Sequence, residues 1–206
     1  MTNERISFDE QLHLFLKLGY KLNDGIDRNT FLTDLSRIEG IENIMEDFEA
    51  KPFVKLYYYL GNTSTDKFLR YTDNCIWYDI EFLDPSSQYK SFMERMGLIT
   101  NGEIKFTDIE IITDSLNYEW IKFKANGTYK EWKLQKKGYI ADSYFNRFAK
   151  LTEELGTKGK YTYFDDGGQQ FVIDYATPDE QKQFIKSTGL SREWLGEGNH
   201  FSQPID

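Results

Sequence analysis

The residues in this chain that could perform chemistry are few and widely spaced. Two histidines, His13 and His200, and a single cysteine, Cys75, are far apart in the sequence. A zinc site needs several His, Cys or carboxylate ligands, usually at clustered spacing. His13 adjoins the apolar stripe of a predicted helix, and Cys75 begins a predicted strand, where a thiol is typically buried and inert. The sequence therefore predicts no metal site and no cofactor.

Acidic residues beside glycines are the remaining candidates for acid–base chemistry. Asp165 and Asp166 could serve as paired carboxylates, but two glycines follow them, and this composition is sufficient to explain a tight turn. Glu197 and His200 lie in a glycine-containing segment, which either presents both side chains or forms a docking tail. No phosphate-binding loop, dinucleotide motif or serine nucleophile elbow occurs in the sequence. We therefore favour a protein without enzymatic activity. An enzyme or small-ligand binder that uses these acids and His200 is the alternative.

Net charge limits the partners that the protein can attract. The formal net charge is −9, which argues against nucleic acid, because a nucleic-acid binder needs a basic surface. The first fifty residues contain eleven acidic side chains against five basic ones, so this part of the chain would steer a basic protein toward it. Residues 120–138 are instead rich in lysine. Ordinary solvated faces would also account for both charged regions. The candidate partner-binding residues are Glu42, Glu46, Asp47, Glu49, Asp165, Asp166, Trp194, Glu197 and His200.

The composition is typical of an intracellular protein. The first ten residues are polar, and no apolar run is long enough for a membrane span. One cysteine cannot form an internal disulfide, which is typical of a reducing compartment. Hydrophobic residues make up only 39% of the chain, but aromatic residues make up 17%, and their large rings can supply a core. We expect a cytoplasmic protein without a membrane partner.

Helices and antiparallel strands must together position these residues. Ser7 with Glu10, and Thr177 with Glu180, form capping boxes, each of which predicts the start of a helix. Apolar residues three and four apart predict further helices that begin near residues 30, 84 and 140. Aromatic and β-branched runs predict strands over 53–60, 75–83, 104–112, 120–124, 129–135, 161–164 and 170–175. This order of elements indicates an α+β fold, with an antiparallel sheet packed by helices.

Asn126-Gly127 is a strong hairpin signal, because Asn-Gly supplies the two positive φ angles of a type I′ turn. With a two-residue turn, Trp132 would lie opposite Ile121, and Trp120 would lie opposite Lys133. Successive strand residues point to opposite faces, so one tryptophan would face the core and the other would face outward. An outward tryptophan is a residue type enriched in interface hot spots. Core packing of both tryptophans against the helices is the arrangement that we favour.

Two segments of the chain match one another at several positions. Residues 78–85 and 171–178 share an aromatic residue, an isoleucine, an acid, a second aromatic residue and a proline at the same spacing. We interpret the match as a tandem helix–strand–strand–helix duplication around a central β-hairpin, with helices on one face of the sheet. The single domain of 1–206 would then contain repeats at about 29–98 and 139–190, the hairpin at about 103–135 and an irregular tail at 191–206. In the alternative enzyme, the pocket would lie between the repeats.

Three segments, Gly138–Asp142, Tyr163–Gln170 and Arg192–Gly198, look like parts of a single-domain bacterial protein of unassigned function. As a whole, the chain resembles the immunity proteins of bacterial polymorphic-toxin and type VI secretion systems, which are small, acidic, aromatic-rich and cytoplasmic. The resemblance covers the style of the whole chain and includes no diagnostic motif, so it assigns no residue. It implies inhibition of a cognate toxin by tight binding, often with acidic side chains meeting a basic active site. We accordingly expect a cytoplasmic protein-binding module of the immunity type, with its oligomeric state left open.

Overall fold

The computed structural model describes residues 5–39, 41–64, 69–79, 87–134 and 142–197. The helices are α1 (Phe8–Lys17), α2 (Arg28–Glu39), α3 (Ile41–Ala50), α4 (Val54–Leu60), α5 (Ser87–Leu98), α6 (Asp142–Leu155) and α7 (Pro178–Thr188). The strands are β1 (Cys75–Asp79), β2 (Phe106–Thr113), β3 (Glu119–Ala125), β4 (Thr128–Lys133), β5 (Lys160–Asp165), β6 (Gln170–Ala176) and β7 (Glu193–Trp194). All strand pairs are antiparallel, so the predicted α+β class is confirmed. No helix within the described ranges is long and apolar enough to cross a membrane.

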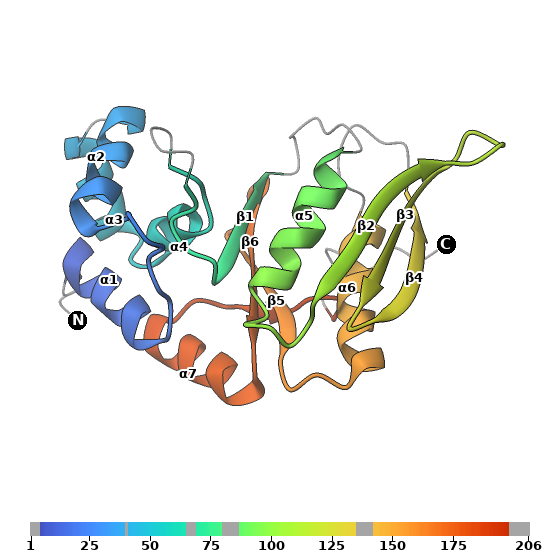
Figure 1. The fold of residues 1–206 in the computed structure, drawn as a ribbon. Coiled ribbons are helices and arrows are strands. Elements are labelled where there is room, and N and C mark those ends of the chain that lie inside the picture. Colours follow the sequence, from blue (N-terminus) through green and yellow to red (C-terminus); the bar gives the residue numbers. More distant parts are fainter. Residues whose placement is uncertain (1–4, 40, 65–68, 80–86, 135–141, 198–206) are drawn as a thin grey trace.

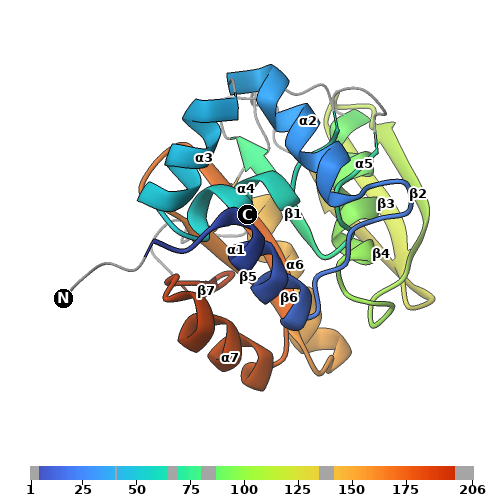
Figure 2. The ribbon, with the colours of Figure 1, turned by 90° about the vertical axis from the view of Figure 1, so that its left-hand side faces the viewer.

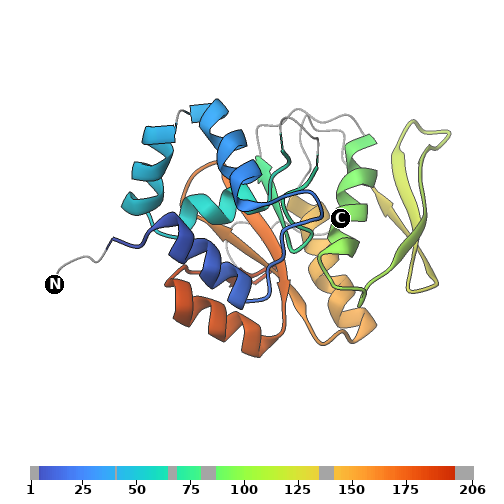
Figure 3. The same ribbon diagram turned by 60° about the vertical axis from the view of Figure 1, so that its left-hand side comes forward.

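The molecule is layered around a four-stranded sheet with the order β1–β6–β5–β7. Helices α1, α4 and α7 cover one face, with α2 and α3 beside them, whereas α5 and α6 cover the other face (Figure 1). Figure 2 looks onto the first of these helical layers. Beyond α5 and α6 lies the second sheet, with the order β2–β3–β4 (Figure 3). The expectation that helices cover only one face of the sheet is therefore wrong.

Strand β6 shows why the central sheet is covered on both faces. Phe171 and Ile173 pack in the core that contains α5 and α6, while Val172, between them, packs in the core of the opposite face. In β5, Tyr163 and Phe164 divide between the two cores in the same way. Successive side chains of a strand point to opposite faces, so a strand with large apolar side chains at consecutive positions must be buried from both sides.

Residues 54–60 form helix α4 in place of the predicted strand. The run is rich in aromatic residues, which favours strands, but tertiary packing overrides this preference. Leu56, Tyr57 and Leu60 are at most 1% exposed, and their spacing places them on one side of a helix. In a strand, Lys55, Tyr57 and Tyr59 would lie on a common face, so burial of the two tyrosines would also bury the lysine.

The tandem duplication is not confirmed. Its first copy requires a strand where α4 lies. The matched strands are β1 and β6, which pair with one another, with Tyr78 opposite Phe171. The helices that follow them pack in different cores, because Phe92 of α5 belongs to one and Phe184 of α7 to the other. Part of the match, at 80–86, lies outside the described residues. Within the described residues, the two matched segments therefore do not belong to two copies of one structural unit.

The central hairpin forms as the Asn-Gly signal predicts. Asn126 and Gly127 have φ angles of 48° and 82°. Trp120 pairs with Lys133, and Ile121 pairs with Trp132, which is the predicted register. Because Ile121 and Trp132 pack with the core, Trp120 lies on the opposite face of the sheet. The favoured expectation that both tryptophans pack in the core is therefore wrong for Trp120.

Both predicted capping boxes are present. The hydroxyls of Ser7 and Thr177 accept the backbone N–H of Glu10 and Glu180, and each glutamate accepts the N–H of its capping residue in return. These reciprocal bonds satisfy N–H groups at the starts of α1 and α7 that have no partner within the helix. Local signals of this kind position both helices against the sheet.

The loop after α4 is tied to α2 by a buried carboxylate. Asp34 is 1% exposed and accepts hydrogen bonds from the hydroxyl of Ser64 and, at 3.2 Å, from that of Tyr71. Arg37 lies 4.0 Å from the same carboxylate. The described parts of this loop therefore belong to the helical layer, and residues 65–68 lie outside the description.

Candidate functional site

The three-stranded sheet has one face turned away from the core. Ile121 and Trp132 point to the core, so Ile112, Trp120 and Lys133, which adjoin them in the ladder, point away from it. Large apolar side chains lie on this outer side, most of them near the β2–β3 connection. We call this surface the aromatic face and define it by Ile112, Leu116, Tyr118, Trp120 and Tyr129.

Three side chains of the aromatic face are well exposed. Leu116 is 75% exposed, Tyr129 56% and Tyr118 45%. Leu116 and Tyr118 belong to the connection between β2 and β3, which reaches beyond the rest of the sheet (Figure 1). The ammonium of Lys133 lies 3.4 Å from the centre of the Tyr118 ring, which holds that ring on the outer side. Exposed aromatic and aliphatic side chains close together, as Leu116 and Tyr118 are, are typical of an interaction surface.

Asp114 holds the tip of this hairpin and orients Trp120. Its carboxylate accepts the backbone N–H groups of Leu116 and Tyr118 and the indole N–H of Trp120, each at 2.9 Å. These hydrogen bonds lower the pKa of Asp114, because they favour its charged form. The bond from the Tyr118 backbone has the largest effect, and the bond from Trp120 the next largest. The tip is therefore a defined turn that presents Leu116.

Charged side chains cross the aromatic face between Trp120 and Tyr129, where Glu110, Lys122 and Glu131 lie side by side on the three strands. Lys124 lies 2.8 Å from Asp108, and Lys122 lies 3.8 Å from Glu131. These carboxylates offset the lysines that dominate the sequence of this region. The aromatic face thus has its apolar side chains around Trp120 near the β2–β3 connection, and a row of mixed charge separates them from Tyr129. It is not a basic patch.

The acidic candidates of α3 lie on the other side of the molecule (Figure 1 and Figure 3). Glu42, Glu46, Asp47 and Glu49 all belong to this helix. Glu46 is exposed, whereas Glu49 lies 3.3 Å from Arg5. An ion pair between exposed side chains contributes little stability, so Glu49 can exchange Arg5 for another cation. The helix offers acidic groups to solvent, but far from the aromatic face.

Asp166 lies in a groove of about 550 Å³ between α4 and the β5–β6 turn. It accepts a hydrogen bond of 3.0 Å from the hydroxyl of Tyr58 and lies 3.5 Å from the ammonium of Lys51. Burial, followed by the charge of Asp166, raises the pKa of Tyr58 above its ordinary value. Asp165 instead accepts the backbone N–H of Gly167 at 2.9 Å. Asp165 therefore stabilises the turn, as its neighbours in the sequence predict.

Trp77 lines the other end of this groove, and no sequence pattern singled it out. Its indole N–H donates to the side-chain oxygen of Gln170 at 3.3 Å. Trp77 also lines an adjoining hollow of about 260 Å³ toward α5. The groove thus combines aromatic rings with amide, ammonium and carboxylate groups, which suits a small polar molecule.

The C-terminal candidates do not lie with Asp166. Trp194 belongs to β7, a strand that the sequence did not predict, and pairs with Thr162. Glu197 lies 3.5 Å from Lys160, which begins β5, whereas Asp166 follows the end of that strand. Five steps along a strand span roughly 16 Å, so Glu197 and Asp166 are too far apart to act on one small substrate. His200 lies outside the described residues.

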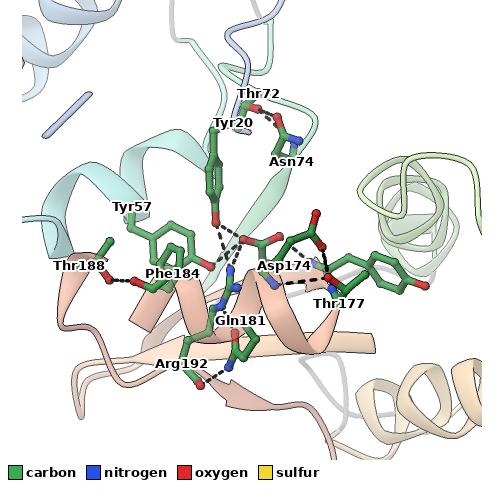
Figure 4. A network of polar contacts seen from close by, with 12 residues as sticks. Tyr20, Tyr57, Thr72, Asn74, Asp174, Thr177, Gln181, Phe184, Thr188 and Arg192 are labelled. Atoms are coloured by element: carbon green, nitrogen blue, oxygen red, sulfur yellow. Dashed lines mark hydrogen bonds and ion pairs between the residues drawn. The ribbon is translucent and has the colours of Figure 1, made fainter. Parts of the chain in front are cut away.

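A buried polar network lies on the face of the central sheet that α1, α4 and α7 cover (Figure 4). One carboxylate oxygen of Asp174 accepts hydrogen bonds from the hydroxyl of Tyr20, from that of Tyr57 at 3.0 Å and from the guanidinium of Arg192 at 2.7 Å. The guanidinium also donates to the side-chain oxygen of Gln181 at 2.5 Å. Asp174 and Arg192 are only 4% and 5% exposed.

This network holds the fold together. Burial, followed by the charge of Asp174, raises the pKa of Tyr20 and Tyr57, so both remain neutral hydrogen-bond donors. Arg192 lies just before β7 and ties the C-terminal segment to the core. Sequence reasoning missed the network, although an acid among the apolar residues of the predicted strand 170–175 was a usable signal.

Within the described residues, no group of three or more His, Cys, Asp and Glu side chains is placed to hold a metal ion. No protein-family model, curated protein or solved structure matches this chain. The surfaces that can be argued as functional are therefore the aromatic face and the Asp166 groove, each on its own geometry.

Proposed function

We propose that this protein is a binding module that recognises another protein through the aromatic face. The observation that carries the proposal is the exposure of Leu116 and Tyr118 beside the half-buried Trp120, with the exposed Tyr129 further along the same face of the sheet. Tryptophan and tyrosine are enriched among the residues that dominate binding energy. A sheet backbone is already ordered before it binds, which keeps the entropic cost of association low.

The proposed partner is a basic protein, and the proposed class is an immunity-type inhibitor that neutralises a toxin in the cytoplasm. A net charge of −9 supports this choice, since a negative surface attracts a basic partner and speeds association. The same charge disfavours a nucleic-acid partner. Helix α3 would contribute to steering and not to contact, because it lies away from the aromatic face (Figure 1). In acidity and aromatic content the chain also resembles immunity proteins.

Capture from a lysate of the source organism, followed by growth rescue, tests this proposal. Immobilised wild-type protein should retain a basic protein, and Leu116→Ser should weaken the interaction roughly tenfold or more, as loss of a residue worth about 1.4 kcal/mol does. Leu16→Ser is the matched control, because Leu16 is 45% exposed on α1. Coexpression of the wild type should restore growth to cells that produce the captured protein.

Equal capture by the two leucine variants would contradict the aromatic face as the contact surface. A captured protein that does not impair growth would contradict the immunity class.

A small-ligand function for the Asp166 groove is the second candidate. The observation in its favour is that Lys51, Tyr58 and Asp166 meet in a groove of about 550 Å³. A compound that binds there should raise the melting temperature, and Asp166→Asn, which removes the charge and keeps the shape, should reduce that rise. A rise that is unchanged by both Asp166→Asn and Lys51→Met would exclude the groove as its site.

A further inference from the structure

Arg95 of α5 has a guanidinium that lines the hollow of about 260 Å³ beside β1. One of its nitrogens donates to the carbonyl of Gly61 at 2.8 Å, and the backbone N–H of Trp77 donates to the same oxygen at 2.9 Å. These two bonds hold the guanidinium next to Trp77, at the edge of the central sheet. A guanidinium has several N–H donors in a planar fork, so Arg95 can still donate to a group that enters the hollow.

Within the described part of the chain, Arg95 forms no ion pair with a carboxylate. Asp73, whose charge acts on Arg95 from farther away, lies 2.6 Å from Arg70, and the positive charge of Arg70 opposes that of Arg95. Burial, followed by the charge of Arg70, lowers the pKa of Arg95 to about 10, because both disfavour its charged form. A carboxylate bound in the hollow would supply the missing counter-charge and could accept two parallel hydrogen bonds from the guanidinium.

Aromatic side chains form apolar walls of the same hollow. Trp77 of β1 and Phe92 of α5 both line it. Phe92 lies three residues before Arg95, so the two side chains share one side of α5. Gln88, on the same side of the helix, adds an amide that can both donate and accept hydrogen bonds. The hollow therefore offers aromatic rings to an apolar group that lies beside a carboxylate on Arg95.

Asp79 adds a negative charge to the hollow. It lies two residues after Trp77 on β1, so both side chains project from the same side of the strand. The carboxylate lies 3.5 Å from the amide nitrogen of Gln170, and a carboxylate has several acceptor positions, so Asp79 can also accept an ammonium group. A purely anionic ligand would be repelled by Asp79, and a purely cationic ligand would be repelled by Arg95.

A small zwitterion is the ligand that complements both charges. Pockets for drug-sized ligands enclose roughly 300–1,000 Å³, so a hollow of about 260 Å³ suits a smaller molecule. An α-amino acid has a carboxylate and an ammonium on one carbon atom. An apolar side chain on that carbon would pack against Trp77 and Phe92.

We propose that this hollow binds a free α-amino acid with an apolar side chain, with the carboxylate on Arg95 and the ammonium on Asp79. The inference is independent of the protein-binding function proposed above, since no described residue that lines the hollow belongs to the aromatic face. It also differs from the small-ligand function of the Asp166 groove. The hollow shares Trp77 with that groove, but Asp166 does not line it.

Isothermal titration calorimetry with L-leucine, L-phenylalanine and L-tryptophan tests this site. At least one of the three should bind the wild type with a Kd below about 1 mM. The decarboxylated amine and the N-acetyl derivative of the amino acid that binds best should each bind at least about tenfold more weakly, since each leaves one charge of the site without its partner. Absence of binding by all three amino acids, or equal binding of either analogue, would overturn the proposal.

Single substitutions assign the two charges. Asp79→Asn keeps the shape of the side chain, so it should weaken binding of the amino acid at least about tenfold and reduce its advantage over the N-acetyl derivative. A purely structural role of Asp79 would not change this preference. Arg95→Met keeps a long apolar side chain, and it should weaken binding of the amino acid and of the N-acetyl derivative but not that of the amine. Melting curves of the free variants show whether each is folded, and Asp79→Asn alone decides the question if Arg95→Met is not.

Asp166→Asn is the matched control, because Asp166 lines the adjoining groove and not the hollow. This variant should bind the amino acid with the affinity of the wild type. Loss of binding in Asp166→Asn but not in Asp79→Asn would place the ligand in the groove, which would refute the hollow and leave the small-ligand function of the groove intact. Wild-type affinity in a folded Asp79→Asn variant would also refute the proposal.

Discussion

Removal of the Asp174 carboxylate should strongly destabilise the central network. Asp174→Ala leaves the guanidinium of Arg192 buried without its counter-charge, in a residue that is only 5% exposed. The hydroxyls of Tyr20 and Tyr57 lose their acceptor at the same time. Removal of one partner of a buried ion pair costs about 3–5 kcal/mol, and each buried polar group left unpaired costs about 1–3 kcal/mol. We expect a loss of about 4 kcal/mol or more, out of the about 5–15 kcal/mol that stabilises a typical domain.

Two further variants separate the contributions of charge and hydrogen bonding. Asp174→Asn has the same shape and keeps an oxygen that accepts from a hydroxyl, so we expect a smaller loss of about 2 kcal/mol. Asp174→Leu combined with Arg192→Met removes both charges, and should be less destabilising than Asp174→Ala, because no charge is then left buried and unpaired. Guanidinium chloride unfolding, followed by circular dichroism and tryptophan fluorescence, gives the free energy of unfolding of each variant.

A loss below about 1 kcal/mol for Asp174→Ala, with an unchanged slope of the unfolding curve, would refute this reasoning. It would mean that Arg192 finds water or another acceptor when the carboxylate is removed. A double variant less stable than Asp174→Ala would contradict the argument that the unpaired charge dominates the cost.

Three other predictions concern buried groups and close packing. Burial, and to a smaller extent the charge of Asp174, raises the pKa of Cys75 well above its ordinary value. The thiol of the native protein should therefore react with a disulfide reagent on the order of a hundredfold more slowly than the thiol of the unfolded protein. Similar rates would contradict the burial of Cys75. Burial likewise raises the pKa of Tyr20, Tyr57 and Tyr161, so they bind protons more tightly in the folded state than in the unfolded state, where tyrosine ionises at about pH 10. The free energy of unfolding should therefore fall as the pH rises above about 10. The measurement is tyrosinate absorbance of the native protein, and titration of all fourteen tyrosines near pH 10 would disprove the prediction. A Cβ at Gly61 would lie 2.3 Å from the backbone nitrogen of Trp77, so Gly61→Ala should lower the free energy of unfolding in guanidinium chloride by about 1–3 kcal/mol or more. Gly168→Ala, where the nearest atom would be 3.4 Å from the new Cβ, should be nearly neutral. Equal effects of the two substitutions would show that the backbone at Gly61 can adjust.

Sequence reasoning succeeded where a few adjacent residues decide the outcome. The capping box of Ser7 and Glu10 needs four residues, and the register of β3 and β4 follows from the turn at Asn126-Gly127 alone. Helix α4 could not be predicted in this way, because Tyr57 is buried by residues such as Phe15 and Phe164, which are distant in the sequence. Propensity favoured a strand there, and long-range packing decided otherwise.

Some of the functional candidates could likewise be predicted from local sequence, and others could not. The turn role of Asp165 and the outward direction of Trp120 both follow from local geometry, and the sequence contained the information for each. The common face of Ile112, Trp120 and Tyr129 depends on how two hairpins combine into one sheet, and only the structure displays it. Charge alone pointed to the acidic residues, but charge does not indicate which of them fold onto a common surface.

Photo-crosslinking from the hairpin tip tests most directly whether the aromatic face contacts a protein partner. Benzoylphenylalanine is placed at Leu116 or, as the matched control, at Leu16, which are both exposed. Leu116 belongs to the β2–β3 connection and Leu16 to α1, two elements on opposite sides of the molecule (Figure 1). In cells of the source organism, we expect irradiation to give one discrete adduct between the 24.4 kDa chain and another protein from position 116, and none from position 16. No adduct from position 116, an adduct only with a second copy of the chain, or the same adduct from both positions would contradict the proposal.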